Sequence, residues 1–420
     1  MNELKSGTMI DLTEGGQIKV VKELGRGGQG IVYLAEYQGS QYALKWYTQD
    51  YPDSFYLNIK HNIEVGAPSD EFLWPLMLTQ KQFGSFGYVM KLRPQEYVEF
   101  GDYLLGKTQF TSFSAMLTAA MKISEGFYHL HLKGFSYQDL NDGNFFINMQ
   151  TGDVLICDND NVIAQGMNTG IMGKARYMAP EIVAGSKPDK YSDYYSLSVM
   201  LFMLFFGNHP LEGKKVVSVP CMTEKHEKKF YGSEALFIYD KNDQSNIPVR
   251  GVHTNVIGRW PLFPNELKEA FIDALSQDKL KNPTKRLIES KWESVFSNVR
   301  NNLVVCTSCG SETFADVNNP TKCINCSKDI VVATSLKTNR NGTIALSPKK
   351  SIFLGKEKQP IAVVRTNKKD PSIWALQNLT NKTWVVETKS GKIKQVEPKG
   401  IMPTKKGLRI NFGSEKAEII

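Results

Sequence analysis

The stretch Asp-Leu-Asn-Asp-Gly-Asn at residues 139–144, with Asp158 fourteen positions after its last residue, decides the fold of this chain. An acid, an amide five residues later and a second acid at the end of a predicted strand form the polar set of a phosphoryl-transfer site. Asp139 can orient a hydroxyl nucleophile, while Asn144 and Asp158 can hold Mg²⁺ against the phosphates of ATP. Three residues alone prove little, so the interpretation depends on the rest of the chain.

A glycine-rich turn lies upstream, between predicted strands at 17–24 and 31–36, and contains Gly25, Gly27 and Gly30. The pattern is weak evidence alone, because glycine also makes plain hairpins and a dinucleotide-binding turn needs a helix after it. Strand-like residues follow here instead. This favours a flap whose backbone amides approach phosphate oxygens.

Lys45 follows on the third predicted strand. A lysine there can pair with the α- and β-phosphates of ATP, and the small Ala43 leaves room for adenine. The lysine also needs a carboxylate partner. We expect Glu64, in a predicted short helix over 57–66, with Glu71 as the competing candidate.

These features occur in the order typical of one enzyme family. Over about residues 17–299 the chain resembles a eukaryotic-type protein kinase domain. The matching elements are the glycine turn, Lys45, Glu64, Asp139 with Asn144, Asp158, Ala179-Pro180-Glu181, Asp193 and Arg286. Chance explains any one of them but not all of them in sequence. The resemblance implies a two-lobed α+β fold, which agrees with predicted strands first and helices later.

The resemblance also implies roles for individual residues. Asp139 would accept or orient the proton of the substrate hydroxyl, and Lys45 would pair with Glu64 and with the phosphates. ATP and Mg²⁺ are the implied cofactors. The implied nucleotide- and Mg²⁺-binding residues are Gly25, Gly27, Gly30, Val32, Ala43, Lys45, Met90, Leu92, Asn144 and Asp158.

Further residues would support this site. Glu181 and Arg286 would form a buried ion pair beneath the activation segment, and Asp193 would brace the catalytic loop. Met90 would lie at the back of the adenine pocket and Leu92 on the hinge between the lobes.

Two family motifs are altered. The usual His-Arg-Asp is Tyr137-Gln138-Asp, so the arginine that reads a phosphate on the activation loop is missing. We therefore expect little control by phosphorylation of that loop, for example at Thr169. The usual Asp-Phe-Gly is Asp-Asn159-Asp160, in which Asp160 is either a second metal ligand or a local turn residue.

A third departure concerns charge beside the catalytic acid. Asn141 replaces a lysine that Ser/Thr kinases carry, and Lys174 stands where they carry threonine. We hypothesise that Lys174 restores the missing positive charge next to Asp139 and is part of the catalytic set. These two positions normally help to distinguish Ser/Thr kinases from Tyr kinases, and both are altered here. We therefore prefer Ser/Thr specificity only because it is the more frequent one.

Four cysteines form two Cys-x-x-Cys pairs, Cys306 with Cys309 and Cys323 with Cys326. This spacing brings four thiolates to one tetrahedral Zn²⁺ and indicates a zinc ribbon. A redox dithiol or an iron–sulfur cluster is the alternative. Removal of zinc should unfold this segment and leave phosphoryl transfer largely intact.

The C-terminal segment is predicted to be all-β, because short alternating strands are separated by Gly-containing turns. The motif Phe353-Leu354-Gly355-Lys356 and the predicted strands at 374–380 and 406–413 make the tail from about Ile344 resemble a degenerate forkhead-associated domain. The Arg and Ser-x-x-His with which that family reads phosphothreonine are not visible, so plain partner docking is expected. The expected domains are therefore a kinase domain at 1–299, a zinc ribbon at 300–332 and a β-rich docking domain at 338–420.

Charge is uneven along the chain. Residues 327–420 carry 19 Lys and Arg against 7 Asp and Glu, a net +12, which leaves −4 for the rest of a chain with a total of +8. The basic residues are scattered without aromatic interleaving, so nucleic acid is not an expected partner.

No stretch is long enough to span a membrane, the first residues lack a signal-peptide pattern, and the cysteine spacing suits a reducing compartment, so we expect a cytoplasmic protein.

The preferred interpretation is an ATP-dependent Ser/Thr protein kinase of bacterial style, acting on a protein partner in signalling or stress response. The resemblance also suggests a cognate phosphatase and a von Willebrand-type protein as partners. A pseudokinase scaffold and a small-molecule kinase are the alternatives. Retention of Lys45, Asp139, Asn144 and Asp158 argues against the first, and the Ala-Pro-Glu segment with Arg286 argues against the second.

Overall fold

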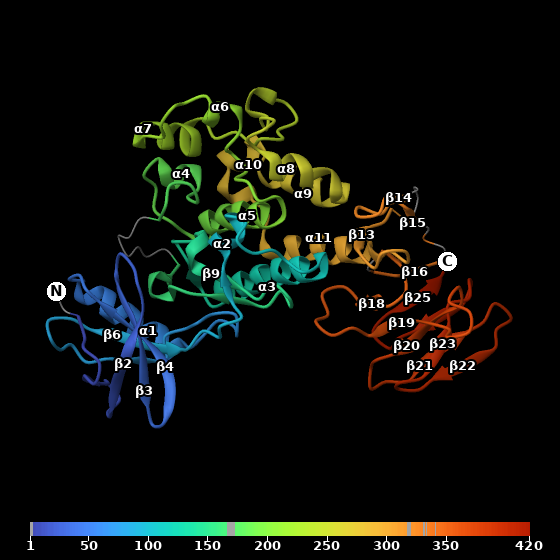
Figure 1. The fold of residues 1–420 in the computed structure, drawn as a ribbon, viewed down its shortest axis with the longest axis horizontal. Coiled ribbons are helices and arrows are strands. Elements are labelled where there is room, and N and C mark those ends of the chain that lie inside the picture. The colour runs from blue at the N-terminus through green and yellow to red at the C-terminus, as the bar shows by residue number, and fades with distance from the viewer. Residues whose placement is uncertain (1–2, 166–172, 317–320, 331, 333, 341) are drawn as a thin grey trace.

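The computed structural model describes residues 3–165, 173–316, 321–330, 332, 334–340 and 342–420. The predicted α+β architecture is present (Figure 1): a β-rich N-terminal lobe, a helical lobe, two small hairpins that carry the cysteines, and a β-rich C-terminal domain. Thr169, the position proposed above for phosphorylation, lies outside the described residues. In the part of the chain that is described, no helix is long and apolar enough to cross a membrane.

The N-terminal lobe is one antiparallel sheet with the strand order β1-β2-β3-β4-β6-β5 and a single long helix. Its strands alternate inward apolar and outward polar residues, as in Ile18 and Val20 of β2, so one face forms a small core with Trp46. The elements are β1 Met9–Asp11, β2 Gln17–Arg26, β3 Gly30–Tyr37, β4 Ser40–Tyr47, α1 Asp53–Val65, β5 Met77–Leu78 and β6 Gly87–Lys91.

The helical lobe is organised around α5, Lys190–Phe206, whose side chains from Ser192 to Phe206 are all buried. This central helix begins with a capping box, in which Asp189 accepts from the backbone of Ser192 while the Ser192 hydroxyl accepts from the backbone N–H of Asp189. The other helices are α2 Phe100–Leu104, α3 Phe113–Leu132, α4 Pro180–Val183, α6 Lys214–Val217, α7 Glu224–Glu227, α8 Thr254–Arg259, α9 Asn265–Ala274, α10 Gln277–Lys281 and α11 Glu289–Asn301.

Short strands lie between the two lobes and carry the loops of the site. They are β7 Val98–Glu99, β8 Phe135–Ser136, β9 Phe145–Ile147, β10 Val154–Ile156 and β11 Ile163–Ala164. β9 pairs with β7 and β10, and β8 pairs with β11. Residues 137–144 therefore form the loop between β8 and β9, and residues 157–162 form the loop between β10 and β11.

After α11, the chain forms two short hairpins and then two larger sheets. The hairpins pair β12 Leu303–Val305 with β13 Glu312–Phe314, and β14 Thr321–Lys322 with β15 Asp329–Ile330. The sheets have the orders β17-β16-β25-β24-β21-β22 and β18-β19-β20-β23. Their strands are β16 Ser335–Thr338, β17 Thr343–Ala345, β18 Ser351–Ile352, β19 Ala362–Thr366, β20 Trp374–Asn378, β21 Trp384–Glu387, β22 Ile393–Val396, β23 Ile401–Pro403, β24 Arg409–Asn411 and β25 Lys416–Ile419.

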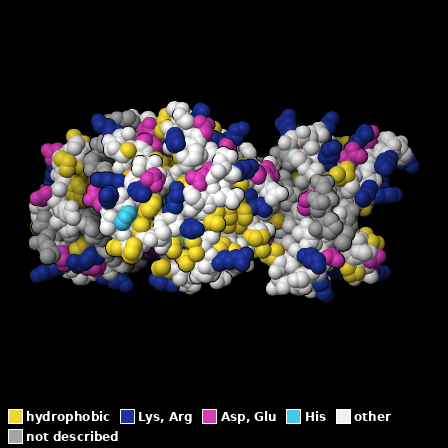
Figure 2. Space-filling model, turned by 90° about the horizontal axis from the view of Figure 1, so that it is seen from above, with side chains coloured by type: hydrophobic (Ala, Val, Ile, Leu, Met, Phe, Trp, Pro, Cys, Tyr) yellow, Lys and Arg dark blue, Asp and Glu magenta, His cyan; other side chains and the backbone are white. Residues whose placement is uncertain are grey.

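The two sheets of the C-terminal domain share one apolar core. Leu376 and Met402 come from one sheet, while Trp384 and Ile410 come from the other. On the face seen in Figure 2, the Lys and Arg side chains of this domain are interspersed with acidic ones. The net positive charge of the C-terminal region therefore does not form one continuous patch on that face.

Candidate functional site

Asp139 lies at the centre of the loop between β8 and β9, close to the lobe boundary. Asn141 Nδ2 donates to its Oδ1 at 3.2 Å, and Asn161 Nδ2 lies 3.5 Å from its Oδ2. Asn144 Nδ2 donates to the Asp139 carbonyl oxygen at 2.8 Å, which closes the loop on itself. The loop therefore holds Asp139 and Asn144 in a fixed relation, as the sequence spacing predicts, and Asn161 joins them from the second loop.

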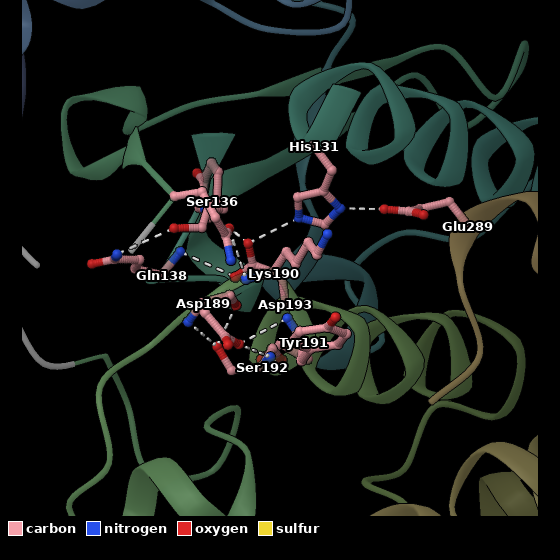
Figure 3. A network of polar contacts seen from close by, with 12 residues as sticks. His131, Ser136, Gln138, Asp189, Lys190, Tyr191, Ser192, Asp193 and Glu289 are labelled. Carbon is pink, nitrogen blue, oxygen red and sulfur yellow. Dashed lines mark hydrogen bonds and ion pairs between the residues drawn. The ribbon is translucent and has the colours of Figure 1, made fainter. Parts of the chain in front are cut away.

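The catalytic loop is braced from below by Asp193 of α5, as the resemblance implies (Figure 3). Its two carboxylate oxygens accept from the backbone N–H of Tyr137 at 2.7 Å and of Gln138 at 3.2 Å. His131 at the end of α3 lies 3.0 Å from the same carboxylate through Nε2, and its Nδ1 donates to Glu289 of α11. A buried imidazole thus links the loop to the last helix of the lobe.

The two carboxylates control the charge of His131. Burial by itself lowers the pKa of His131, but its hydrogen bonds to Asp193 and Glu289 outweigh burial and raise the pKa to about 9. The imidazole is therefore charged at neutral pH and neutralises part of the charge of two carboxylates that are almost completely buried. Sequence reasoning missed this histidine, although its place near the end of a helix favours a cation.

Asp139 is partly withdrawn from water, and this changes its acidity. Burial raises its pKa to about 6, the hydrogen bond from Asn141 lowers it, and the nearby charge of Asp158 raises it again. Asp139 therefore has a higher proton affinity than an ordinary aspartate, which suits a group that takes a proton from a hydroxyl.

Lys45 has a different partner from the one predicted. Its Nζ lies 2.8 Å from Asp160 Oδ2 and 3.2 Å from Asp158 Oδ1, and it donates to Gln29 Oε1 at 3.0 Å. Burial by itself lowers the pKa of Lys45, but the two carboxylates outweigh it and hold the pKa above its usual value. The ammonium group therefore stays charged in a buried position.

Neither predicted glutamate reaches this lysine. Glu64 is exposed in the last turn of α1, because that helix turns Phe55, Ile59 and Asn62 inward at i, i+4 and i+7. Glu71 lies beside Gly126 of α3. The structure thus does not bring Glu64 to Lys45.

Asp160 is completely buried beside Lys45, in the position where we expected Glu64. Its Oδ2 accepts from the Tyr47 hydroxyl at 2.5 Å as well as from Lys45. Asn159 precedes it where the family has an aromatic plug, and its side chain donates to the carbonyl oxygens of Leu73 and Ile156, both at 2.9 Å. The sequence predicted that Asp160 is either a metal ligand or a turn residue. Neither prediction included its role as the partner of Lys45.

Residues of the predicted adenine pocket cluster together. Val32, Ala43, Met90 and Leu92 belong to one apolar cluster, in which Ala43 of β4 pairs directly with Met90 of β6. In the glycine turn, a Cβ on Gly25 or on Gly27 would meet no atom within 4 Å, whereas one on Gly30 would lie 2.2 Å from the Trp46 carbonyl oxygen. Gly30 is thus required for packing, and the other two leave the turn open.

Asp158 and Asn144 offer the oxygen ligands that a hard cation prefers. Asp158 is in the left-handed region at φ 52°, which turns its carboxylate out at the end of β10, and that side chain is 45% exposed. Asn144 is buried in the adjacent loop, with its Nδ2 already used by the Asp139 carbonyl. Its Oδ1 and the Asp158 carboxylate therefore fit Mg²⁺ chemistry.

Lys174 does not contact Asp139. Its Nζ lies 3.3 Å from Asp142 Oδ1, and 62% of its side chain is exposed. Its charge nevertheless lowers the pKa of Asp139 through space. The adjacent Gly173 packs against the catalytic acid, since a Cβ there would lie 3.1 Å from Asp139 Oδ1.

Two ion pairs hold the end of the activation segment at residues 173–181. Arg286 binds Glu181 bidentately, with both N–O distances at 2.7 Å, which confirms the predicted pair. Arg176 binds Glu212 in the same manner at 2.6 and 3.0 Å, and the Tyr231 hydroxyl donates to that carboxylate at 2.7 Å. No motif in residues 212–264 indicated a role for this segment, and in the structure its Glu212 holds Arg176.

The four cysteines form a second candidate metal site. Their Sγ atoms all lie within 4.8 Å of one another, with Cys306–Cys326 at 3.7 Å and Cys309–Cys323 at 3.5 Å. A tetrahedron with Zn–S bonds of about 2.3 Å has edges of about 3.8 Å, so the sulfurs fit Zn²⁺.

The two cysteine knuckles have the same backbone. The N–H of Gly310 donates to the Cys306 carbonyl and that of Ser327 to the Cys323 carbonyl, both at 2.9 Å, and both donors have positive φ. The aromatic ring of Phe314, after the first knuckle, packs between those of Phe113 and Phe263 in the helical lobe, with centroids 5.0 and 5.2 Å away. The module is thus joined to the lobe by an apolar contact that the sequence did not indicate.

Comparison with known proteins agrees with the geometry of the cleft. The protein kinase domain family model matches residues 18–290. The chain is 29% identical over 205 residues to protein kinase C delta type of Mus musculus, covering 46% of this chain and 29% of that protein. It is 26% identical over 233 residues to cyclic GMP-binding protein C of Dictyostelium discoideum, covering 47% of this chain and 9% of that one. The chain thus spans less than a third of the length of these relatives.

Proposed function

We propose that this chain, which belongs to the protein kinase family, transfers the γ-phosphoryl group of ATP to Ser or Thr hydroxyls of a protein. The observation that carries this proposal is the closed loop in which Asp139, with its raised pKa, is held by Asn144 and lies near Asp158, which in turn pairs with Lys45 of the N-terminal lobe. ATP supplies the phosphoryl group, and Mg²⁺ neutralises charge on the phosphates when bound.

Each residue has a separate part in this proposal. Asp139 accepts or orients the proton of the incoming hydroxyl, while Asn144 and Asp158 hold Mg²⁺. Lys45 binds the α- and β-phosphates, and the amides of the glycine turn cover them. Lys174 sets the charge around Asp139 through space and does not bind it directly.

We also propose that Asp160 takes the role that Glu64 has in the resemblance. It is a positioning residue, since it holds Lys45 through Oδ2 and touches no reacting atom. Tyr47 fixes the same carboxylate oxygen, so the lysine is clamped between β4 and the loop after β10. In this arrangement α1 supplies no carboxylate to Lys45, although Asn58 and Asn62 of that helix donate to the carbonyl oxygen of Val162 in the same loop.

The bidentate pair of Glu181 with Arg286 favours a protein substrate, because it supports the segment that forms the peptide platform of protein kinases.

The C-terminal domain is proposed to be a degenerate forkhead-associated-like docking module. Its turn at Gly355 faces the catalytic domain, since the carbonyl oxygen of Gly355 accepts from Ser297 Oγ at 2.6 Å and from Arg300 Nη2 at 2.8 Å. A role in bacterial signalling, with a cognate phosphatase and a von Willebrand-type protein, remains part of the proposal by resemblance alone.

Incubation with radiolabelled ATP and Mg²⁺ tests the function. We expect the wild type to label itself or a general protein substrate, and Asp139→Ala to lose about a thousandfold in rate. Asp102→Ala, which removes a partly exposed acid of α2, serves as the control and should keep its rate. Phosphoamino-acid analysis of the product separates Ser/Thr from Tyr transfer.

Absence of labelling with any protein, together with measurable ATP binding, would replace the proposal with the pseudokinase scaffold. Phosphorylation of a small molecule in place of protein would favour the small-molecule kinase.

A further inference from the structure

A large cavity lies outside the catalytic cleft, between the helical lobe and the C-terminal domain. Its volume is about 750 Å³, and it is lined by residues of α3, α11, β12 and the segment 349–359. This volume lies in the range of pockets that bind small organic ligands. No residue of the phosphoryl-transfer site contributes to its walls.

Two cations in the cavity wall have no counter-ion among the described residues. Lys350 is only 8% exposed, and its Nζ donates to one acceptor there, the carbonyl oxygen of Asn301 at 2.6 Å. Arg300 stacks on Phe353 at 4.0 Å and donates through Nη2 to the Gly355 carbonyl, but its buried Nε has no partner. Three or more N–H donors therefore remain available on two neighbouring positive groups.

Five carboxylates line the same cavity, and among the described residues none of them pairs with Arg300 or Lys350. Asp153 pairs with Lys122, and Glu357 is exposed. Glu125 pairs with Lys358 at 3.0 Å, and Glu293 pairs with Lys356 at 2.6 Å. Glu312 accepts from the backbone N–H of Ser114 at 2.9 Å, at the start of α3. Within the described part of the chain, Arg300 and Lys350 therefore have no carboxylate partner.

This arrangement is costly unless an anion is present. Burial, with a contribution from the neighbouring guanidinium, lowers the pKa of Lys350 to about 7, and burial lowers the pKa of Arg300 to about 10. A doubly charged anion between them would neutralise both groups, whereas a single carboxylate would neutralise one. Phosphate oxygens also match the unused N–H donors in number.

We propose that this cavity binds a small phosphate-bearing molecule through Arg300 and Lys350. The volume exceeds the needs of one phosphate, so an organic group can be accommodated beside it. Because Arg300 belongs to α11 and Lys350 to the segment before β18, such a ligand contacts the catalytic domain and the C-terminal domain at once. Its binding would stabilise their contact by mass action. The proposal does not depend on the catalytic activity.

The test uses the full-length chain and inorganic phosphate as the probe. Phosphate is titrated without Mg²⁺ and without nucleotide, because a nucleotide analogue carries phosphates of its own and would compete for the cavity. The variants below separate binding in the cavity from binding in the catalytic cleft. Isothermal titration at constant ionic strength should then show one saturable site in the wild type. Lys350→Met and Arg300→Gln should each weaken phosphate binding at least tenfold, because each removes a charged donor.

Lys394→Met, which removes an exposed lysine of β22, is the matched control and should bind phosphate like the wild type. Lys350→Met removes an uncompensated buried charge, so we expect it to fold, and a thermal melt verifies this. The same melts give a second measurement: phosphate should raise the melting temperature of the wild type but not that of Lys350→Met.

Lack of saturable binding in the wild type, or unchanged affinity in both variants, would overturn the proposal. Equal binding of acetate would also overturn it, since the cavity would then be a general anion site with no preference for phosphate.

Discussion

The phosphoryl-transfer cleft and the four-cysteine module both offer ligands to a cation, but they are built in opposite ways. The module takes its four sulfurs from residues 306–326, and two copies of one local backbone turn position them. The cleft joins Lys45 to Asp158, which is 113 positions away, across two lobes. A local site fixes its own ligand set, whereas a site assembled from distant segments can exchange one partner for another. Asp160 in place of Glu64 is such an exchange.

Removal of zinc should give the largest effect, because metal binding supplies most of the folding free energy of such modules, on the order of 10 kcal/mol. We expect chelation or Cys323→Ser to unfold residues 303–330, as followed by backbone NMR signals. The helical lobe should melt at a lower temperature, since Phe314 would leave its contact with Phe113 and Phe263. Below that melt, the phosphorylation rate should change less than about threefold.

Cys221→Ser is the control for the zinc experiment, because this exposed cysteine lies outside the module. An ordered module in the metal-free Cys323→Ser protein would show that local hydrogen bonds, and not the metal, hold the two knuckles.

Asp160→Asn should give the next largest effect and tests the exchange of partners in the cleft. Loss of this charge leaves Lys45 with Asp158 alone, so we expect kcat/KM for ATP to fall about a hundredfold, equivalent to about 3 kcal/mol. Glu64→Gln should stay within twofold of the wild type. Steady-state kinetics with varied ATP measure kcat/KM for both variants. A larger loss for Glu64→Gln than for Asp160→Asn would assign the role of lysine partner to Glu64.

The brace beneath the catalytic loop should make stability fall at alkaline pH. The pKa of His131 is raised from 6.5 to about 9 in the folded protein, so its contribution is complete below pH 6.5 and is lost as pH rises through 9. We expect the free energy of unfolding to fall by about 3 kcal/mol over this interval in urea titrations.

His131→Gln should be less stable at pH 6.5 and should have a flatter profile between pH 6.5 and 9.5. A wild-type profile that is equally flat would mean that the imidazole is not charged between Asp193 and Glu289.

Lys174→Ala should have the smallest effect. Its ion pair with Asp142 is exposed, and such pairs contribute less than about 1 kcal/mol. We expect the rate to fall three- to fivefold, through the charge that Lys174 places near Asp139. A hundredfold loss in kcat would show that Lys174 moves to the reacting groups during the reaction.

Sequence patterns predicted the parts of this molecule that depend on neighbours in the chain. The cysteine knuckles and the loop from Asp139 to Asn144 both follow from local spacing. The adenine-side cluster of Val32, Ala43 and Met90 also agrees, because strand pairing follows from the short turns between strands.

The partner of Lys45 could not be predicted in this way. Whether Glu64 points inward depends on the rotation of α1, which Phe55, Ile59 and Asn62 determine by packing. The spacing of these three residues at i, i+4 and i+7 places them on one face of the helix. This spacing is visible in the sequence and would have excluded Glu64 from the inward face. The links of His131 to Glu289 and of Arg176 to Glu212 join segments too distant for any spacing rule.

The aromatic contact of Phe314 has a consequence for how this protein can be divided. A chain that stopped at residue 299 would keep every group of the cleft, yet it would leave the faces of Phe113 and Phe263 exposed to water and prone to association. The four-cysteine module thus covers part of an apolar surface of the helical lobe. Exchange of this module between related proteins would have to preserve the ring of Phe314 as well as the four cysteine sulfurs.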